Sequence, residues 1–272
     1  MLLIFGLGYT AIRGAAAWPA PVVGTTRDGR EGSLRFDDAS SVLPAIAAAT
    51  HILSSVPPAD DIDPVLALYG EALGGKWLGY LSSTGVYGDA GGAWVDEGAP
   101  TGGGRRAARA AADAAWLERG ARVFRLPGIY GPGRSPIDRV RHGKAHRVGV
   151  LEQVFSRVHV DDIVAGVLSA TTAPAGAYNL ADDRPCSQDD VVVFAAGLIG
   201  LPPPPLVTLD TLSPMARGFY AENRRVANGK AKRVLGWRPA YPDYRLGLRA
   251  LNAMTSPTPA SAAPAPASGD QR

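Results

Sequence analysis

The chain has 272 residues, a length that suits one large α/β domain or a nucleotide-binding domain with a small substrate-binding lobe. Its single cysteine excludes an internal disulfide framework, and its net charge of +3 comes from dispersed basic residues without the face or motif of a nucleic-acid binder. The apolar start, Met1–Phe5, is too short for a signal peptide, and no run approaches the ~18 apolar residues needed to cross a membrane. We therefore expect a cytoplasmic protein whose partner is a small-molecule substrate, with no nucleic acid and no membrane.

Short, almost wholly apolar runs alternate with helical patterns in the first half of the chain. Such runs are typical of parallel strands that are covered on both faces. We predict strands at Leu2–Phe5, Pro21–Gly24, Ser33–Phe36, His51–Ser55, Trp77–Ser82 and Val123–Leu126. The alanine-rich stretch Ala107–Leu117, which ends near Gly120, predicts a helix before the last of them. This alternation predicts an α/β fold with a Rossmann-type doubly wound parallel sheet.

The pattern loosens after Gly131, where we predict a small C-terminal substrate-binding lobe. Helices are expected at Ile163–Ala170, preceded by Asp161 and Asp162, and between Ser187 and Gly200. We predict a single nucleotide-binding domain over residues 1–255, and the lobe is expected to come mainly from residues 131–160 and 183–251, closing with Arg224–Trp237 and Tyr241–Leu251. Residues 256–272 are almost all Ala, Pro, Ser and Gly, which predicts a disordered tail.

A glycine-rich turn, Gly6-Leu7-Gly8-Tyr9-Thr10-Ala11, follows directly on the first predicted strand and leads into a helix. The first glycine allows a tight turn, the second lets the backbone approach a pyrophosphate, and the alanine permits close helix–strand packing. The start of the helix then offers free N–H groups and partial positive charge. The turn predicts a dinucleotide site, and its cofactor-binding residues are Gly6, Gly8, Tyr9, Thr10 and Ala11.

The second predicted strand ends in Gly24-Thr25-Thr26-Arg27, without the acidic residue that an NAD-selective site usually carries there. Arg27 can hold a 2′-phosphate bidentately and Thr26 can donate to it, so we predict NADP(H), with NAD(H) as the alternative. A solvated arginine beside Asp28 would give the same sequence. Asp37 is predicted to contact adenine, although an ordinary turn aspartate would look the same. Ser55 completes this part of the predicted cofactor site.

Three further sequence motifs narrow the choice of protein family. They are Leu81-Ser82-Ser83-Thr84-Gly85-Val86-Tyr87-Gly88, Arg125-Leu126-Pro127-Gly128-Ile129-Tyr130-Gly131-Pro132-Gly133 and Val158-His159-Val160-Asp161-Asp162. In this order and approximate spacing, and with Leu235-Gly236-Trp237 near the end, they resemble the extended short-chain dehydrogenase/reductases, the NAD-dependent epimerase/dehydratase group. The resemblance runs from Met1 to about Leu251.

The resemblance implies roles by position. Ser83 would polarise the substrate oxygen, Pro127 would end its strand beside the nicotinamide, and Arg109 would belong to the cofactor site. Tyr87 belongs to the signature without being the catalytic tyrosine, and His159 would help position its segment over the substrate. We therefore predict Ser83 as catalytic, and Thr84, Tyr87 and His159 as substrate-binding residues. Apart from the resemblance, Arg134, Arg139 and Arg157 of the lobe could meet an anionic group, although each could equally be a surface charge, and Arg134 is added to the predicted substrate-binding residues.

The chain departs from the family where the proton donor should lie. The family uses a tyrosine with a lysine four residues later, at the start of the helix after the serine motif, and the lysine lowers the pKa of the tyrosine. Counting back from Asp113, Arg105 takes the place of the tyrosine and Arg109 that of the lysine. Arginine is always protonated, so Arg105 cannot be an ordinary general acid, whereas Arg109 can contact ribose or phosphate as a fixed cation. A solvated basic helix face of Arg105, Arg106 and Arg109 is the alternative. The chain resembles an atypical subgroup that lacks the tyrosine.

Two functions follow from these patterns. The first is an NADP(H)-dependent oxidoreductase or epimerase/dehydratase-like enzyme acting on a small polar, sugar-derived substrate. The second is a catalytically inactive nucleotide-binding sensor or scaffold, which the missing tyrosine and lysine would explain. The family resemblance also implies a homodimer. We predict no metal site, because His142, His146 and Cys186 lack ligand spacing, and both histidines are expected in a surface loop.

Overall fold

A parallel sheet of seven strands forms the centre of the molecule. The computed structural model describes residues 1–104, 106–150 and 152–255, except the side chain of Met215. The strands lie in the order β10-β7-β5-β4-β1-β2-β3, and every neighbouring pair is parallel. Their bounds are β1 Leu2–Phe5, β2 Val22–Thr26, β3 Leu34–Arg35, β4 His51–Ser54, β5 Trp77–Ser83, β7 Arg122–Leu126 and β10 Gly176–Asn179. The predicted Rossmann-type fold is confirmed. The strand order reverses between β1 and β4, the position at which open α/β sheets bind ligands.

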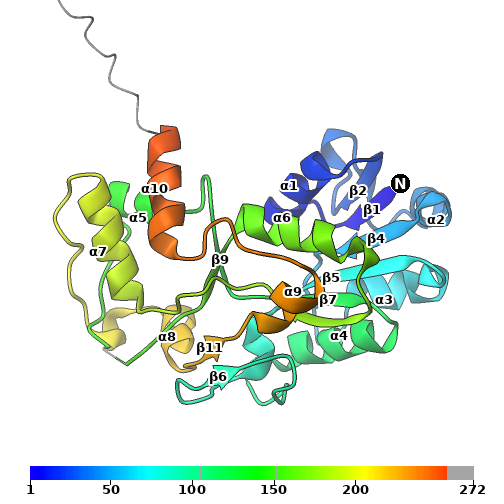
Figure 1. Cartoon of the computed structure of the whole chain (residues 1–272). Helices are drawn as coiled ribbons and strands as arrows, with labels where there is room; N and C mark the ends of the chain where they lie inside the picture. Colours follow the sequence, from blue (N-terminus) through cyan, green and yellow to red (C-terminus); the bar gives the residue numbers. More distant parts are fainter. Residues whose placement is uncertain (105, 151, 256–272) are drawn as a thin grey trace, which may run out of the picture.

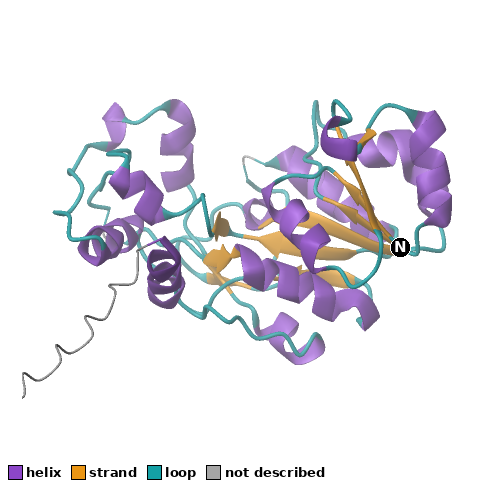
Figure 2. Cartoon of the chain, turned by 90° about the horizontal axis from the view of Figure 1, so that it is seen from above, coloured by secondary structure: helices purple, strands orange, loops and turns teal. Residues whose placement is uncertain are grey.

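Helices cover both faces of this sheet, as Figures 1 and 2 show. The side chains of β1 explain the arrangement, since successive residues point to opposite faces. Leu2 and Ile4 pack with α1 (Tyr9–Ala17) and α6 (Val160–Ser169). Leu3 and Phe5 pack on the opposite face, with α2 (Ala39–Ala48), α3 (Pro64–Tyr69) and α4 (Ala107–Glu118).

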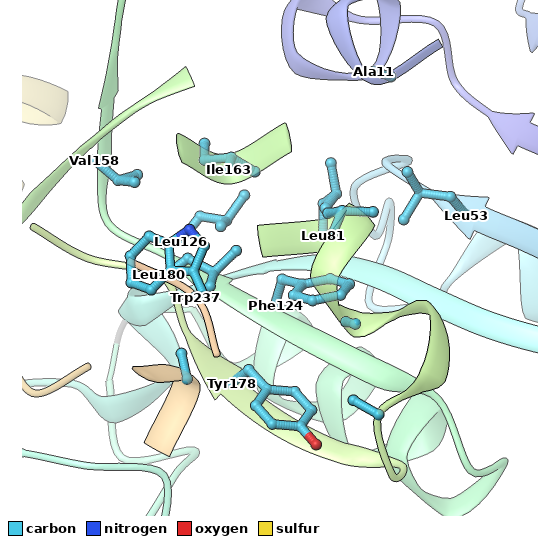
Figure 3. Close-up of a cluster of buried hydrophobic side chains, with 14 of the residues drawn as sticks. Ala11, Leu53, Leu81, Phe124, Leu126, Val158, Ile163, Tyr178, Leu180 and Trp237 are labelled. Atoms are coloured by element: carbon cyan, nitrogen blue, oxygen red, sulfur yellow. The ribbon is translucent and has the colours of Figure 1, made fainter. Parts of the chain in front are cut away.

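The tryptophan near the end of the chain ties the C-terminal segment to the sheet. Trp237 lies in the same cluster as Leu81, Phe124 and Leu126 from the central strands (Figure 3). Its indole N–H donates to the carbonyl of Asp162 over 2.9 Å. The buried carboxylate of Asp162 also accepts from the backbone N–H of Ala240. The acid predicted to flank a helix therefore also anchors a remote segment.

The remaining elements form the lobe beside the carboxyl ends of the strands. Its own core joins α5, α7 and α10, which lie together at the left of Figure 1. The lobe and its connections comprise β6 Trp94–Val95, β8 Gly128–Tyr130, α5 Pro136–Arg141, β9 Arg157–His159, α7 Gln188–Leu198, α8 Pro214–Tyr220, β11 Arg225–Val226, α9 Gly229–Val234 and α10 Tyr244–Thr255.

Several elements differ from the sequence prediction. β10 was not predicted, because Gly-Ala-Tyr-Asn lacks an apolar run, although Tyr178 is fully buried. α5 and α8 were also missed; each is short and opens with a proline behind a serine cap. The predicted tail, residues 256–272, lies outside the described residues. Over the part of the chain that the structure describes, no helix has the length and apolarity to span a membrane.

Candidate active site

A cleft of about 660 Å³ lies at the carboxyl ends of the sheet strands. One side is formed by the glycine-rich turn and by the ends of β4, β5 and β7, and the other side by residues of the lobe. The predicted residues that line it are Gly8, Tyr9, Thr10, Ala11, Ser55, Ser83, Thr84, Arg109, Pro127 and Arg134. Residues from six separate segments of the sequence thus meet at one place.

The glycine-rich turn is shaped to receive an anion. Gly6 has a φ of +84°, and a Cβ there would lie 3.0 Å from Val56 and 3.1 Å from the hydroxyl of Ser55. That hydroxyl donates to the Gly6 carbonyl over 2.5 Å, so Ser55 fixes the turn. Gly8 is open, with no atom within 4 Å of where its Cβ would stand. No side chain caps α1, whereas an aspartate caps each of α2 and α3. The first amides of α1 are therefore available to a pyrophosphate.

Arg134 lies at this end of the cleft. Its guanidinium carbon stands 5.6 Å from the centre of the Tyr9 ring, and Arg13 stands at the same distance from that ring. The Tyr9 hydroxyl donates to the carbonyl of Pro132 over 3.1 Å, which holds the ring across the cleft. Arg134, which was predicted to bind substrate, thus lines the cleft beside the glycine-rich turn.

The end of β2 and the loop after it hold Thr26 and Arg27, two residues of the predicted cofactor site, which are not among the described residues that line the cleft. Arg27 is exposed on the loop after the strand. Thr26 is buried, and its hydroxyl accepts from the Arg30 amide at 3.1 Å and contacts the Ser33 hydroxyl at 2.7 Å. The Ser33 hydroxyl also donates to the Arg30 carbonyl, at 2.6 Å. The Thr26 hydroxyl is thus engaged by groups of the loop itself, and it contributes to the shape of the loop beside Arg27. Asp37 is exposed and accepts two hydrogen bonds from Arg35, at 2.6 and 3.0 Å.

Ser83 ends β5 with its hydroxyl in the cleft. Its oxygen accepts a hydrogen bond from the Gly85 amide at 3.1 Å, which leaves the hydroxyl proton for another acceptor. The Arg106 side chain lies beside Gly85 as well: a Cβ on Gly85 would stand 3.0 Å from the Nε of Arg106 and 3.4 Å from the hydroxyl oxygen of Ser83. Arg105, predicted in the place of the tyrosine, lies outside the described residues. A hydroxyl donor and a guanidinium therefore converge beside Gly85.

Arg109 is held in a fixed position rather than lying on a solvated face. Its guanidinium donates to the Tyr80 hydroxyl at 2.8 Å and stands 5.8 Å from the centre of that ring. Burial raises the pKa of Tyr80 to about 12, so the hydroxyl stays neutral. Arg109 lines the cleft from the place that the family gives to lysine, which fits contact with ribose or phosphate.

Tyr87 does not reach the cleft, which corrects the prediction that it binds substrate. It is 6% exposed, and its hydroxyl donates to Asn179 over 2.7 Å. Arg125 donates to the same hydroxyl at 3.0 Å and forms a buried ion pair of 2.7 Å with Asp113. The signature tyrosine thus belongs to a buried network that joins β7, β10 and α4 behind Ser83.

His159 is also internal, which corrects its predicted contact with substrate. It is 2% exposed, and its Nδ1 accepts from the Asp161 amide at 3.2 Å, so it caps α6. Its ring centre lies 4.2 Å from that of Tyr241 and 5.2 Å from that of Tyr130. Burial lowers the pKa of His159, which favours the neutral ring that capping requires.

The lobe wall holds cleft residues that the sequence did not reveal. His146 lies in an irregular segment, as predicted, and also lines the cleft, whereas His142 lies in an exposed turn. The other unpredicted residues of this wall include Phe155, Phe219, Tyr220, Glu222 and Arg224. Glu222 supplies the only carboxylate among the described residues of the cleft, and it pairs with Arg224 at 3.0 Å. None of these lies in a periodic or motif-bearing segment. The described residues contain no group of three or more metal-ligating side chains.

A buried carboxyl behind the lobe wall leads to a prediction about stability. Burial raises the pKa of Asp182 to about 8, so the folded state keeps a proton that the unfolded chain loses near pH 4. The free energy of unfolding should therefore fall as the pH rises from about 4 to about 8. Asp182→Asn keeps the acceptor for the Arg184 amide and removes the charge. At pH 8 we expect this substitution to raise the melting temperature, by about 2–4 °C for each kcal/mol of unfolding free energy that it recovers. At pH 5 we expect the melting temperatures of the two proteins to differ little.

The measurement is thermal unfolding of both proteins at the two pH values. Asp61→Asn is the control, because Asp61 is exposed and has a φ of +62°, which asparagine adopts readily. An equal effect of Asp182→Asn at pH 5 and pH 8 would contradict the assignment.

Comparison with known proteins places the fold. No family model matches the chain. A structure of a conserved protein of unknown function from Silicibacter pomeroyi is 40% identical, covers 93% of this chain and 98% of that chain, and superposes with a TM-score of 0.84. dTDP-glucose 4,6-dehydratase from Bacillus anthracis, solved with NAD, gives a TM-score of 0.73 at 16% identity, covering 93% of this chain and 95% of that chain. A human epimerase family protein solved with NADPH gives a TM-score of 0.70 at 14% identity, covering 93% of this chain and 99% of that chain. The last two matches show the fold alone.

Two curated proteins are similar in sequence. A 3-diazoavenalumate denitrifying reductase from a Streptomyces species is 31% identical over 138 residues, which are 46% of this chain and 45% of that protein. The match thus spans less than half of the reductase. Protein YeeZ from Escherichia coli is 28% identical over 88% of this chain and 96% of its own length. The resemblance to the extended short-chain dehydrogenase/reductases is confirmed in the fold.

Proposed function

Because the chain has the fold of the extended short-chain dehydrogenase/reductases, the NAD-dependent epimerase/dehydratase group, we propose that it is an NADP(H)-dependent oxidoreductase. Gly8, the first amides of α1 and Arg134 would hold the pyrophosphate, and Arg109 the nicotinamide ribose. A nicotinamide bound along this wall would supply or accept a hydride near Pro127. Ser83 would donate its hydroxyl proton in a hydrogen bond to an oxygen of the substrate.

One observation carries this proposal: the uncapped glycine-rich turn and the donor hydroxyl of Ser83 line the same cleft. A dinucleotide on the turn and a substrate on Ser83 would be neighbours there, and open α/β sheets bind ligands at this edge. The family relatives solved with NAD or NADPH support the choice of cofactor class. An inactive nucleotide sensor would need the turn but not a hydroxyl aimed into the cleft.

We propose, because the chain lacks the tyrosine and lysine pair, that its substrate accepts a hydride without needing a proton from the protein at that position. One relative is, by its name, a denitrifying reductase of a diazo compound. Replacement of a diazonium group by hydride forms a C–H bond, breaks the C–N bond and releases N₂ with the bonding electrons, so no proton is consumed. A carbonyl substrate would instead take its proton from water. A sugar-derived carbonyl compound is the alternative substrate.

Hydride transfer is tested by incubating the purified chain with NADPH and a panel of acceptors, including aryl diazonium salts and sugar-derived carbonyl compounds. The loss of NADPH absorbance is measured against each acceptor without protein, because diazonium salts also react slowly with NADPH alone. Protein-dependent NADPH oxidation at an ordinary enzymatic rate, roughly 1 s⁻¹ or more, is the expected result. Tight NADPH binding with no oxidation by any acceptor would favour the sensor.

Arg27 decides the preference for NADP(H) in this proposal. We expect Arg27→Asp to weaken NADPH binding about tenfold or more, since a bidentate cation is replaced by an anion beside the 2′-phosphate, and to leave NADH binding nearly unchanged. The measurement is fluorescence titration with each cofactor. Arg119→Gln, which removes an exposed arginine just after α4, is the matched control. Equal losses for NADPH and NADH would remove Arg27 from the 2′-phosphate site.

A further inference from the structure

Aromatic side chains line the end of the cleft that lies away from the glycine-rich turn. Phe155 and Tyr220 meet edge to face, with ring centres 5.5 Å apart and planes at 90°. Phe219, on the same helix as Tyr220, also lines the cleft and is 44% exposed. Such rings offer flat apolar surface on which a planar group can stack. This end of the cleft, defined by Phe155, Phe219 and Tyr220, is called the distal chamber below.

The distal chamber also carries positive charge that no carboxylate neutralises directly. Arg157 is only 6% exposed and lines the cleft, yet its guanidinium donates to neutral acceptors: the carbonyls of Phe155, Cys186 and Ser187, the thiol of Cys186, and the side-chain oxygen of Gln188. Within the described chain, no carboxylate forms an ion pair with it or with Arg139. A buried charge without a counter-ion is costly, so an anion that enters the chamber is stabilised by it.

The groups around Tyr220 define where that anion would sit. Arg139 and Arg157 both act electrostatically on the Tyr220 hydroxyl, as does the carboxylate of Asp189 from α7. That carboxylate is already engaged by the amides of Val148 and Gly149, at 2.9 and 2.8 Å. Asp182 lies near Arg157, but its carboxyl stays largely protonated at neutral pH because burial raises its pKa to about 8. Of the charged groups that act on the Tyr220 hydroxyl, Asp189 is the strongest and the two arginines follow, so the charges of these three groups sum to +1.

We infer that the distal chamber binds a ring-bearing anionic substrate, with Arg139 contacting its carboxylate or phosphate and Phe155, Phe219 and Tyr220 contacting its ring. Arg157 supplies a fixed charge behind this contact, since its own N–H groups are used by the protein. This inference rests on the proposed function, because it names the class of substrate that occupies the same cleft. It commits to a single aromatic ring with one acid group. A nucleotide sugar, which has a planar base, a diphosphate and a polar hexose, is the competing ligand in the test.

The test is binding to the full chain saturated with NADPH, measured by calorimetry with four probes: cinnamate, cinnamyl alcohol, phenyl phosphate and UDP-glucose. We expect cinnamate to bind at least about tenfold more tightly than the uncharged alcohol, and Arg139→Gln to lower the affinity for cinnamate about tenfold. The Arg139→Lys variant should keep most of the parent's affinity for cinnamate. Arg141→Gln is the matched control, because Arg141 lies on the same helix, outside the cleft lining, and its loss changes the net charge equally.

The outcomes are distinct. If phenyl phosphate binds more tightly than cinnamate, the site is supported and phosphate is its anion. Equal binding of cinnamate and cinnamyl alcohol, equal effects of Arg139→Gln and Arg141→Gln, tighter binding of UDP-glucose than of both ring acids, or binding of none of the probes would overturn the inference. These results are distinguishable from failure of the proposed function, which would appear as loss of NADPH binding or as no NADPH oxidation by any acceptor in the screen.

Discussion

Gly8→Val is expected to abolish cofactor binding without unfolding the protein. Gly8 has φ −89° and ψ −174°, a region open to valine, and no atom lies within 4 Å of its Cβ position. The new side chain would therefore fill only the space that the pyrophosphate needs. We expect NADPH affinity to fall by about 100-fold or more, which is about 2.8 kcal/mol of binding free energy.

This prediction is checked by NADPH titration together with a thermal melt. Gly14→Ala is the matched control, since Gly14 lies in the same helix with open space around its Cβ position. It should leave the affinity unchanged and stabilise the helix slightly. Gly8→Val protein that melts normally and still binds NADPH like the parent would show that the pyrophosphate does not lie on this turn.

Ser83→Ala is expected to lower kcat by about 10²–10³-fold, the usual cost of removing one donor to a developing oxyanion. The substitution removes the hydroxyl proton that Gly85 leaves available and takes away little volume. NADPH affinity should be unchanged, because the pyrophosphate contacts lie on the glycine-rich turn. Ser83→Thr retains the hydroxyl and should keep most of the activity.

The measurement is steady-state turnover with an acceptor found in the NADPH oxidation screen that bears an oxygen at its reacting group. Equal kcat values for Ser83→Ala and the parent would exclude Ser83 from the reaction. A diazonium substrate gives an additional test, because no oxyanion forms there and the loss should be much smaller.

The sequence predicted the sheet and the cofactor half of the site because strong local signals encode both. Continuous apolar runs marked six of the seven sheet strands, and the glycine spacing marked the turn at its correct place between β1 and α1. β10 was not predicted because Gly-Ala-Tyr-Asn has no run of apolar residues, although Ala177, Tyr178 and Asn179 are all buried. Burial of this kind leaves no periodic apolar pattern in the strand's own sequence, so the strand cannot be predicted from it.

The motif residues show the limit of assignment by position. Tyr87 and His159 stand in recognisable strings, but their side chains turn inward to Asn179 and to the cap of α6. The sequence cannot distinguish a motif residue that supports the site from one that lines it. Arg139 and Arg157 were predicted as candidates to meet an anionic group, but the rings of the distal chamber were not, since its walls come from α5, α7, α8 and irregular segments that lie far apart in the sequence.

Whether this cleft binds NADP(H) is tested by fluorescence titration of the purified chain with NADPH and, separately, with NADH. We expect saturable NADPH binding with much weaker NADH binding, because Arg27 and the absence of an acidic residue at the end of β2 favour the 2′-phosphate. Binding of neither cofactor would contradict the proposed function, since the glycine-rich turn would then have only a structural role.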